Sequence, residues 1–421
     1  METKSVSSIF AVCLAIGVFA EPVVTDAERA AFEKLAEVAV TRPPELRTVG
    51  IGAYSTNRLA FALNNGLAMT KGGRIWASWI SGGDGPGSFT AANWSDDGGD
   101  TWSDVKLVID GHNGTVTGRT NIIGTFWLDP EGMFHCFTDQ SMLHFDGRAG
   151  FWEAVCENPD AEKPVWGPAR RIGNGHVMNK PIILKNGEWA MSSYLNGTWQ
   201  GRGSVPGAFV ELDGERGAVC WVSSDKGTTW EKRGVAHFPG GDWQESQLVE
   251  LTNGTLRVFA RVIDAGKGCL MAADSLDAGR TWTRSYRLLT MDHTNARFQI
   301  QRLKSGRLIF VKHGKPAEAA NQWGGRVRLS AYLSEDDGET WKGGLMLDEG
   351  NGSYPDLFQG PDGMIYVTHD HGRAREAEIW MHRFTEEDVL AGHIVSSRGK
   401  LGLLVMRGMG SAYNRARFHT P

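Results

Sequence analysis

Apolar and polar residues alternate along most of the chain, in pairs of short runs separated by a glycine-containing turn. This pattern is typical of β-hairpins, because successive side chains of a strand point to opposite faces of its sheet. The clearest example is WQESQLVELTNGTLRVFAR, residues 243–261. A two-residue Asn253-Gly254 turn would place Glu245 opposite Val262, one residue from Arg261. We therefore expect an acid and a base at the open end of a hairpin whose middle is apolar.

The same strand–glycine–strand unit recurs along the chain. Its six copies have their turn glycines 52 to 67 residues apart, at Gly73, Gly132, Gly187, Gly254, Gly306 and Gly363. A β-repeat of this period is typical of a propeller in which each repeat forms one blade. The sequence thus predicts an all-β protein, a six-bladed β-propeller with four-stranded blades.

A second repeat, S-x-D-x-G-x-T-W, occurs at residues 95–102, 223–230, 275–282 and 334–341, and we expect a degenerate copy around 145–152. Its Asp can accept hydrogen bonds from the turn backbone, its Gly allows a positive φ, and its Trp can fill the space between sheets. These repeats are Asp boxes (BNR repeats). With them the chain resembles the sialidase (neuraminidase) superfamily of six-bladed propellers over about residues 54–383. The box aspartates are expected to be structural.

The two ends of the chain have other patterns. Residues 1–20 combine a short polar start with an apolar run and small residues near its end, which predicts a signal peptide and hence a secreted or periplasmic protein. Residues 21–47 are expected to form a short N-terminal helical segment. The propeller is placed at residues 48–394, and residues 395–421 are either a C-terminal tail or a closing strand.

Composition narrows the function classes. A net charge of −5 provides no basic field for nucleic acid, and no later apolar run is long enough to span a membrane. The cysteines that remain after signal removal match no zinc spacing, so no metal or cofactor is predicted; they are Cys136, Cys156, Cys220 and Cys269. Disulfides and buried thiols both stay open for these residues, with buried thiols favoured because a core of this size needs no crosslinks. The oligomeric state is left open.

Polar residues gather at the open ends of the six hairpins, which should meet near the propeller axis. The pairing brings together Arg58 with Asp84, Asn121 with Asp139 and Gln140, Asn179 and Lys180 with Tyr194, Glu245 with Arg261, Arg297 with His313, and Tyr354 with Asp370. We expect them to surround a glycan-binding pocket.

The resemblance to sialidases implies a role for many of these residues. That family has three arginines, a Tyr–Glu pair and a separate Asp. The matching positions here are Arg58, Arg261 and Arg326 for the arginines, Tyr354 and Glu245 for the pair, and Asp84 for the acid/base; Asp370, Asn179 and Lys180 are further substrate-binding candidates. The chain departs from the family pattern at Leu59-Ala60, usually Ile-Pro, and at Asp370, usually a glutamate.

The implied activity is a retaining exo-glycosidase that releases a terminal sialic acid or related 2-keto (ulosonic) acid. Guanidinium groups suit the sugar carboxylate, and a neutral phenol that is activated by a carboxylate suits attack beside that anion. Two alternatives stay open. One is a propeller hydrolase or lyase acting on rhamnose- or uronate-containing polysaccharide, with His176, His369 or His371 as acid/base. The other is a non-catalytic glycan-binding propeller, whose pocket binds a glycan without cleaving it. Independently of these functions, Arg58–Asp84 and Glu245–Arg261 could each be an ordinary cross-strand ion pair.

Overall fold

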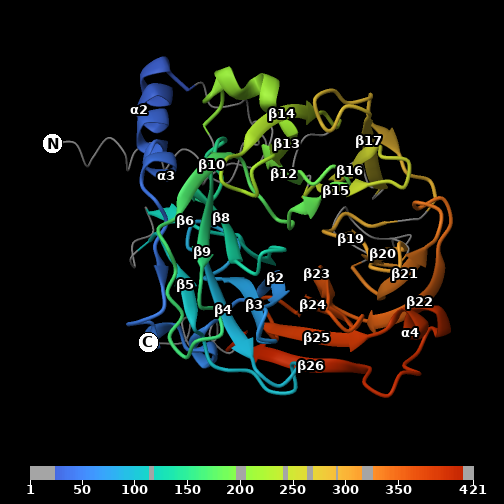
Figure 1. Cartoon of the computed structure of the whole chain (residues 1–421). Coiled ribbons are helices and arrows are strands. Elements are labelled where there is room, and N and C mark those ends of the chain that lie inside the picture. Colours follow the sequence, from blue (N-terminus) through green and yellow to red (C-terminus); the bar gives the residue numbers. More distant parts are fainter. Residues whose placement is uncertain are drawn as a thin grey trace.

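The sheets of the protein are arranged in a ring around a common axis (Figure 1). The structure, a computed structural model, describes residues 24–112, 118–195, 205–239, 245–262, 269–290, 293–314 and 326–410. It contains six antiparallel blades, each with four strands in order from the axis to the rim. The prediction of a six-bladed, all-β propeller is confirmed. The predicted signal peptide, residues 1–20, lies outside the described residues.

The strands follow the chain from blade to blade. Blade one is β2 (Leu63–Met69), β3 (Ile75–Ser81), β4 (Phe89–Ser95) and β5 (Leu107–Ile109), with β1 (Leu46–Arg47) added at its rim. Blade two is β7 (Gly124–Leu128), β8 (Phe134–Met142), β9 (Gly150–Cys156) and β10 (Arg170–Asn174), and β6 (Arg119–Thr120) also pairs with β8. Blade three is β11 (Ile182–Ile183), β12 (Trp189–Leu195), β13 (Gly217–Ser223) and β14 (Glu231–Ala236).

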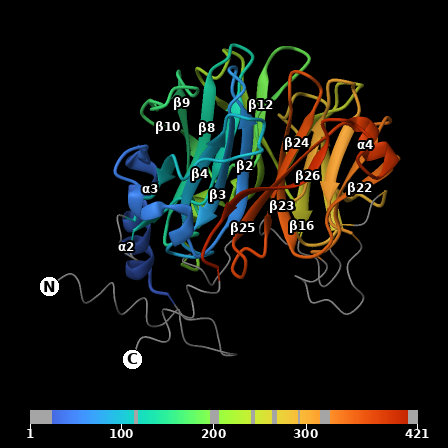
Figure 2. The ribbon, with the colours of Figure 1, turned by 90° about the horizontal axis from the view of Figure 1, so that it is seen from below.

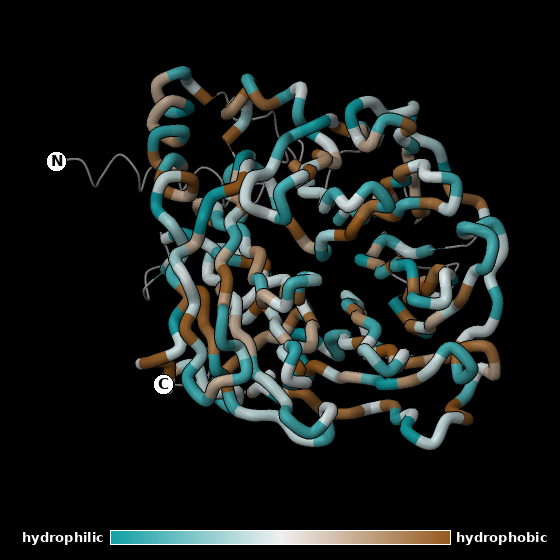
Figure 3. Tube along the Cα trace, viewed as in Figure 1, coloured by the Kyte–Doolittle hydropathy of each residue, from teal (hydrophilic) through white to brown (hydrophobic). Residues whose placement is uncertain are grey.

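The second half of the ring is built in the same way. Blade four is β15 (Gln247–Glu250), β16 (Leu256–Val262), β17 (Cys269–Ser275) and β18 (Tyr286–Arg287). Blade five is β19 (Gln299–Arg302), β20 (Leu308–Lys312), β21 (Leu329–Ser334) and β22 (Lys342–Asp348). Blade six is β23 (Gly352–Gln359), β24 (Ile365–His371), β25 (Glu378–Phe384) and β26 (Lys400–Arg407), so the C-terminal segment contains a rim strand. Hydrophobic and hydrophilic residues alternate in short bands along these strands (Figure 3).

The helices lie outside the ring (Figure 2). The N-terminal helix α2 (Asp26–Ala36) begins at a capping box formed by Thr25 and Glu28. Its buried face belongs to an apolar cluster with residues of blades two and three, and the rings of Phe32 and Phe209 are 6.3 Å apart. The other helices are short: α3 (Val38–Thr41), α4 (Glu386–Ala391), and the 3₁₀ turns η1 (Gly52–Tyr54), η2 (Thr56–Arg58) and η3 (Val210–Glu215). No helix among the described residues is long and apolar enough to cross a membrane.

The four Asp boxes form the same turn between the third and fourth strands of blades one, three, four and five. In the first box, Asp97 Oδ1 accepts hydrogen bonds from Ser95 Oγ at 2.8 Å and from Thr101 N at 2.9 Å. Gly99 N donates to Ser95 Oγ, also at 2.8 Å. The other three boxes repeat these bonds. The aspartates are therefore structural turn residues.

The degenerate fifth box was predicted at the wrong turn. Residues 145–152 join the second and third strands of blade two, whereas the boxes follow the third strand. After β9, the third strand of this blade, Asn158 Oδ1 accepts hydrogen bonds from Cys156 Sγ at 3.5 Å and Val165 N at 2.8 Å. Asn158 thus takes the place of the box aspartate, with Cys156 in place of the serine. The insertion before Trp166 hides the motif in the sequence.

Three cysteines are buried free thiols: Cys136, Cys156 and Cys220. Burial raises the pKa of each, that of Cys220 to about 12, so these groups are inert at neutral pH. The side chain of Cys269 lies outside the described part of the chain. The buried-thiol interpretation holds for the three cysteines that the structure describes.

Candidate active site

Tyr354, Glu245 and Arg261 form a buried hydrogen-bonded group at the inner ends of blades six and four. The Tyr354 hydroxyl donates to Glu245 Oε1 at 2.5 Å. Arg261 Nη1 donates to the same carboxylate oxygen at 2.7 Å and to the phenol oxygen at 3.0 Å. All three side chains are buried. A phenol, a carboxylate and a guanidinium therefore share a volume from which water is largely excluded.

The hairpin that carries Glu245 has a different register from the predicted one. Its turn contains three residues, Thr252 to Gly254, because Leu251 N pairs with Thr255 O at 2.8 Å. The ladder then pairs Gln247 with Phe259, and continuing it outward places Glu245 directly opposite Arg261. The prediction that Glu245 faces Val262 was wrong by one residue. A three-residue loop with glycine at its positive-φ position is the alternative to a two-residue turn that the sequence did not distinguish.

Both partners in the phenol–carboxylate bond have unusual backbones. Tyr354 has φ 55° and Glu245 has φ 41°, in the region that L residues rarely adopt. Tyr354 also lies where the β23–β24 register shifts, between the pairs Ser353–Asp370 and Asp356–Thr368. A bulge redirects a side chain, and backbone strain that persists in a fold is concentrated at functional sites. The backbone geometry alone therefore indicates a functional site at these two residues.

Burial and charge act together on the phenol. Burial raises the pKa of Tyr354 and the Glu245 carboxylate raises it further, while the three nearby arginines act in the opposite direction. Burial lowers the pKa of Arg261, but Glu245 and Tyr354 outweigh that effect and raise it overall. The resting state is thus a neutral phenol beside an ion pair.

Two further arginines lie over the Tyr354 ring. The Cζ atoms of Arg326 and Arg373 are 5.6 Å and 4.7 Å from its centroid. Asn295 connects two of the three cations, since its Oδ1 accepts from Arg261 Nε at 2.6 Å and its carbonyl accepts from Arg326 Nη2 at 3.2 Å. Burial, and then the charges of Arg373 and Arg261, lower the pKa of Arg326 to about 10. Such a group of cations is stabilised by an anion, and a bound carboxylate would supply one.

Arg373 is a site residue that the sequence-based analysis missed. It follows β24, and it is held by Ser353 Oγ, 2.5 Å from its Nη2, and by Asp370 Oδ1, 3.4 Å from its Nε. Asp370 is fully buried and also accepts a hydrogen bond from Asn64 N at 3.3 Å. Asp370 therefore positions an arginine, and its carboxylate faces the protein. The HGR sequence directly after the predicted strand was the available signal.

Arg58, the predicted first arginine, lies elsewhere. It ends the turn η2, where its backbone N donates to Ser55 O at 2.8 Å, and its side chain is exposed. Asp84, its predicted partner, instead lies 3.3 Å from His144 Nε2. The Asp84 side chain is 42% exposed, and its charge is among those that raise the pKa of Arg373 against the lowering effect of burial. The structure thus brings Asp84 close to the arginine group and leaves Arg58 at the surface.

Asn179 and Lys180 have their polar atoms bonded to other residues of the propeller. Asn179 Nδ2 donates to Ser246 O at 2.8 Å, which supports the backbone next to Glu245. Lys180 forms a buried ion pair with Asp356, and burial lowers its pKa despite that partner. Arg297, fully buried, donates to Asn65 O at 2.9 Å and to Met178 O at 2.7 Å, and so links blades five, one and three. The prediction that Asn179 and Lys180 bind substrate is corrected by this placement, because their polar atoms are used within the protein.

The histidines of the alternative interpretation have protein partners too. His176 Nδ1 donates to Asp139, whose other oxygen accepts from Ile122 N and Ile123 N at 2.9 Å. His369 Nε2 lies 2.9 Å from His382 Nε2. His371 Nδ1 lies 2.6 Å from Asp348. The described residues contain no group of three or more histidine, cysteine or carboxylate side chains that could hold a metal ion.

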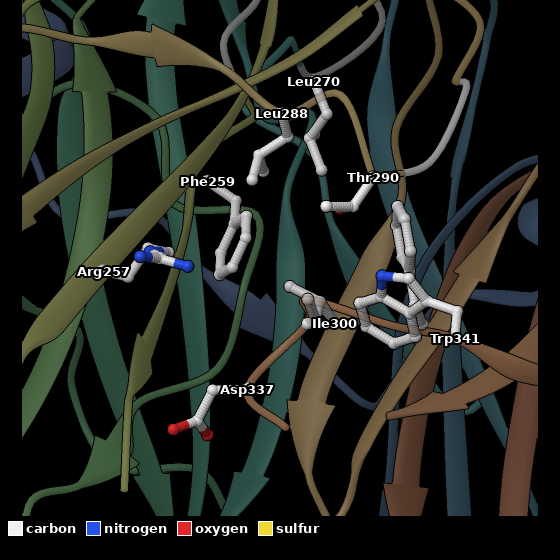
Figure 4. A pocket seen from close by; sticks show the side chains of 10 residues that line it. Arg257, Phe259, Leu270, Leu288, Thr290, Ile300, Asp337 and Trp341 are labelled. Carbon is white, nitrogen blue, oxygen red and sulfur yellow. The ribbon is translucent and has the colours of Figure 1, made fainter. Parts of the chain in front are cut away.

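A separate pocket lies between the sheets of blades four and five (Figure 4). Its walls are mostly apolar, with Phe259, Ile300 and the Asp-box Trp341, and Arg257 and Asp337 stand at its edge. It shares no lining residue with the Tyr354 group. It is a packing gap beside an Asp box and offers no reactive arrangement.

Comparison with known proteins agrees with this fold. The model of the BNR repeat-like domain family matches residues 73–367. The chain belongs to the BNR repeat-like domain family. A curated relative of this BNR repeat-like protein, the anhydrosialidase of Macrobdella decora, is 26% identical over 163 residues, which are 35% of this chain. The match spans only 21% of that relative's length.

Solved sialidase structures share the propeller of this BNR repeat-like protein. The Hadza microbial sialidase Hz136 has a TM-score of 0.55 at 16% identity, over 75% of this chain and 64% of its own. The intramolecular trans-sialidase of Ruminococcus gnavus, in complex with oseltamivir carboxylate, has a TM-score of 0.56 at 13% identity, over 82% and 98%. The leech intramolecular trans-sialidase has a TM-score of 0.57 at 13% identity, over 88% and 73%. The resemblance to sialidase-type Asp-box propellers is confirmed at the level of the fold.

Proposed function

We propose that this BNR repeat-like protein is a retaining exo-glycosidase that releases a terminal sialic acid, or a related 2-keto acid, from glycans. The observation that carries the proposal is the 2.5 Å hydrogen bond between Tyr354 and Glu245 within a group of three arginines. The relatives named above are sialidases and trans-sialidases, which supports the same substrate class.

The arginines account for the choice of an acidic sugar. Arg261, Arg326 and Arg373 come from three different blades and converge on one aromatic ring. Guanidinium groups bind carboxylates through paired hydrogen bonds, and a partly buried site strengthens those bonds. A sugar with its carboxylate on the anomeric carbon would thus be held with that carbon next to the Tyr354 hydroxyl.

The phenol–carboxylate pair accounts for the nucleophile. A carboxylate nucleophile would be repelled by the sugar carboxylate, whereas a neutral phenol is not. As the Tyr354 oxygen bonds to the anomeric carbon, its proton passes to Glu245, and the glycosidic C–O bond breaks. The pKa of Tyr354 is raised at rest, so a base at hydrogen-bond distance is required for this step.

Asp84 would complete the cycle. It lies at the edge of the arginine group, and its side chain is the most exposed of the site carboxylates. In the first step it would donate a proton to the leaving oxygen. In the second step Asp84 would accept a proton from the water that attacks the anomeric carbon. The bond between that carbon and the Tyr354 oxygen breaks, and the oxygen regains its proton from Glu245. Two displacements at one carbon give retention of configuration.

The test is turnover of a panel of aryl 2-keto-acid glycosides by the mature protein and by Tyr354→Phe. Nuclear magnetic resonance of the first-formed product would report its anomeric configuration and would distinguish free sugar from an intramolecular anhydro product. Cleavage with retention, lost in the Phe variant, is expected. Cleavage with inversion, or an undiminished Phe variant, would contradict the proposal.

One observation favours a second candidate, a polysaccharide hydrolase or lyase with a histidine acid/base. The His176 imidazole is oriented by Asp139, as in many catalytic Asp–His pairs, and its ring is 5.3 Å from that of Tyr194. This candidate requires activity on uronate- or rhamnose-containing polysaccharide that is abolished by His176→Gln and insensitive to Tyr354→Phe.

We also propose that residues 1–20 are removed during export. Their polar start, apolar run and small residues have the order of a signal peptide. The mass of the protein recovered from the exported fraction would test this, and a chain that retains these residues would contradict it.

A further inference from the structure

We propose that His144 is a positioning residue for Asp84, and that its imidazole holds that carboxylate in the orientation in which it exchanges protons with the substrate. This inference rests on the acid/base role of Asp84 in the proposed function. The contact itself is a feature of the fold, since His144 Nε2 lies 3.3 Å from Asp84 Oδ1. Asp84 comes from the loop between β3 and β4 of blade one, and His144 from the loop between β8 and β9 of blade two.

The backbone of the His144 loop is constrained in an unfavourable conformation. His144 has φ 107° and Leu143 has φ 61°, and neither is a glycine or asparagine. Such residues cost free energy, and they persist only where the surrounding structure holds them. The restraint is visible: Asp146 accepts hydrogen bonds from Met142 N at 2.8 Å, Arg148 N at 2.8 Å and Ala149 N at 2.7 Å. Its carboxylate is used to hold the loop, so Asp84 is the carboxylate that faces the imidazole.

The loop that carries Asp84 is fixed as well. Gly82 and Gly83 precede it with φ 78° and 117°, and a Cβ on Gly82 would lie 2.1 Å from Gly87 O. Ser88 Oγ donates to the carbonyls of Gly83 and Gly85 at 2.7 Å and 2.6 Å. Two restrained loops from neighbouring blades thus hold one imidazole against one carboxylate.

The side chains of His144 and Asp84 differ strongly in exposure. The His144 side chain is 1% exposed, whereas that of Asp84 is 42% exposed. The imidazole therefore contacts Oδ1 of Asp84 from the protein interior. The Asp84 charge also acts on Arg373, whose pKa it raises against the lowering effect of burial.

The arrangement predicts a specific kinetic signature. Loss of the imidazole lets the carboxylate rotate and should impair proton donation to the leaving group more than any other step. In His144→Gln, kcat should fall by about 10- to 100-fold for alkyl glycosides, whose departure needs a proton, and by less than about threefold for nitrophenyl glycosides, whose departure does not. An equal loss for both substrates would indicate a structural role and would overturn the proposal.

His112 provides a matched control. Its Nε2 contacts Pro86 O in the same loop as Asp84, but it does not contact the carboxylate. His112→Gln should therefore loosen the loop and reduce turnover of both kinds of substrate to a similar extent. A leaving-group dependence in this variant equal to that of His144→Gln would also overturn the proposal.

A second measurement does not depend on activity. Histidine C–H resonances can be followed with pH, and the His144 signal is identified as the one that is absent from His144→Gln. Asp84→Asn should lower the pKa of that imidazole by about one unit, because an adjacent carboxylate stabilises the protonated ring. An identical titration in both proteins, or none in either, would overturn the pairing. Failure of the wild type to cleave any 2-keto-acid glycoside would instead contradict the proposed function, while this titration still decides the pairing.

Discussion

The Tyr354 hydroxyl lies 2.5 Å from Glu245 Oε1, although the two residues are 109 positions apart and both have positive φ. A contact that requires strain at both of its ends is not a by-product of packing. It places a base at a phenol over which two guanidinium groups lie. The nucleophile, its base and a cationic environment are therefore a property of the assembled ring, because blades four, five and six each supply part of it.

Removal of the Tyr354 hydroxyl should abolish turnover while the fold is preserved. In Tyr354→Phe, Glu245 keeps its bond to Arg261, so no buried charge loses its partner. We expect kcat for aryl 2-keto-acid glycosides to fall by about a thousandfold or more, as is typical when a nucleophile is deleted. The measurement is steady-state kinetics together with thermal unfolding.

Tyr366→Phe is the control for that prediction. It makes the same change in the same blade, on a ring that stacks on Phe358 at 4.7 Å and lies outside the Tyr354 group. Both variants should unfold near the wild-type temperature. Residual activity of Tyr354→Phe equal to that of Tyr366→Phe would exclude a nucleophilic role for the phenol.

We expect substitutions of Arg373 and Arg58 to have very different effects on KM. Arg373→Ala should raise KM for carboxylate-bearing substrates by about 100-fold, because a charged hydrogen-bonding partner of the ligand is lost from a partly buried site. Arg58→Ala should change KM by less than about threefold, since its side chain is exposed on η2. Kinetics of the two variants side by side would decide between the sequence-based and structure-based assignments. A large rise in KM for Arg58→Ala alone would instead support the sequence-based assignment of Arg58 to the substrate-binding site.

The sequence predicted the blades and the Tyr354–Glu245–Arg261 group because those features depend on local repeats. The glycine turns and Asp boxes recur with a regular period, and each box is closed by its own side chains. Glu245 and Arg261 lie on one hairpin, so a one-residue error in register still left them neighbours.

The assignments that failed concern residues whose depth within the ring, or whose position in a loop, cannot be predicted from strand pairing. Asn179 and Lys180 were placed at the pocket, but pairing along a strand does not show how far a side chain lies below the mouth, and Lys180 meets Asp356 within the ring. Arg373 was missed because it lies past the end of β24, where no ladder defines its direction. The contact between His144 and Asp84 joins two loops of different blades and has no counterpart in either local pattern.

The Asp boxes should make stability depend on acid pH. Burial raises the pKa of Asp97, but hydrogen bonds from Thr101 and Ser95 outweigh this and lower it to about 2. A carboxylate with a lowered pKa stabilises the fold above its unfolded-state value of about 4, and this contribution is lost as the pH falls toward 2. Asp97→Asn should thus lower the urea midpoint at pH 7, and its difference from wild type should shrink between pH 4 and pH 2.5.

Asp26→Asn is the control for this pH dependence, since the Asp26 side chain is 97% exposed and lies outside the ring. Its urea midpoint should follow that of the wild type throughout. A difference between Asp97→Asn and wild type that stays constant from pH 7 to pH 2.5 would show that the box carboxylate is not the titrating group.

The buried ion group near the axis should be essential for stability. Asp356 is fully buried; it pairs with Lys180, accepts a hydrogen bond from Leu67 N at 2.6 Å, and lies 3.6 Å from Arg297 Nη2. In Asp356→Asn, two buried cations lose their anion, which is expected to lower the free energy of unfolding by about 3–5 kcal/mol. Chemical denaturation would show this as a lower midpoint with an unchanged slope.

Glu131→Gln, which breaks the exposed pair with Lys226, should leave the midpoint unchanged. Equal midpoints for the two variants would mean that the Asp356 carboxylate does not stabilise the contact between blades one, three, five and six.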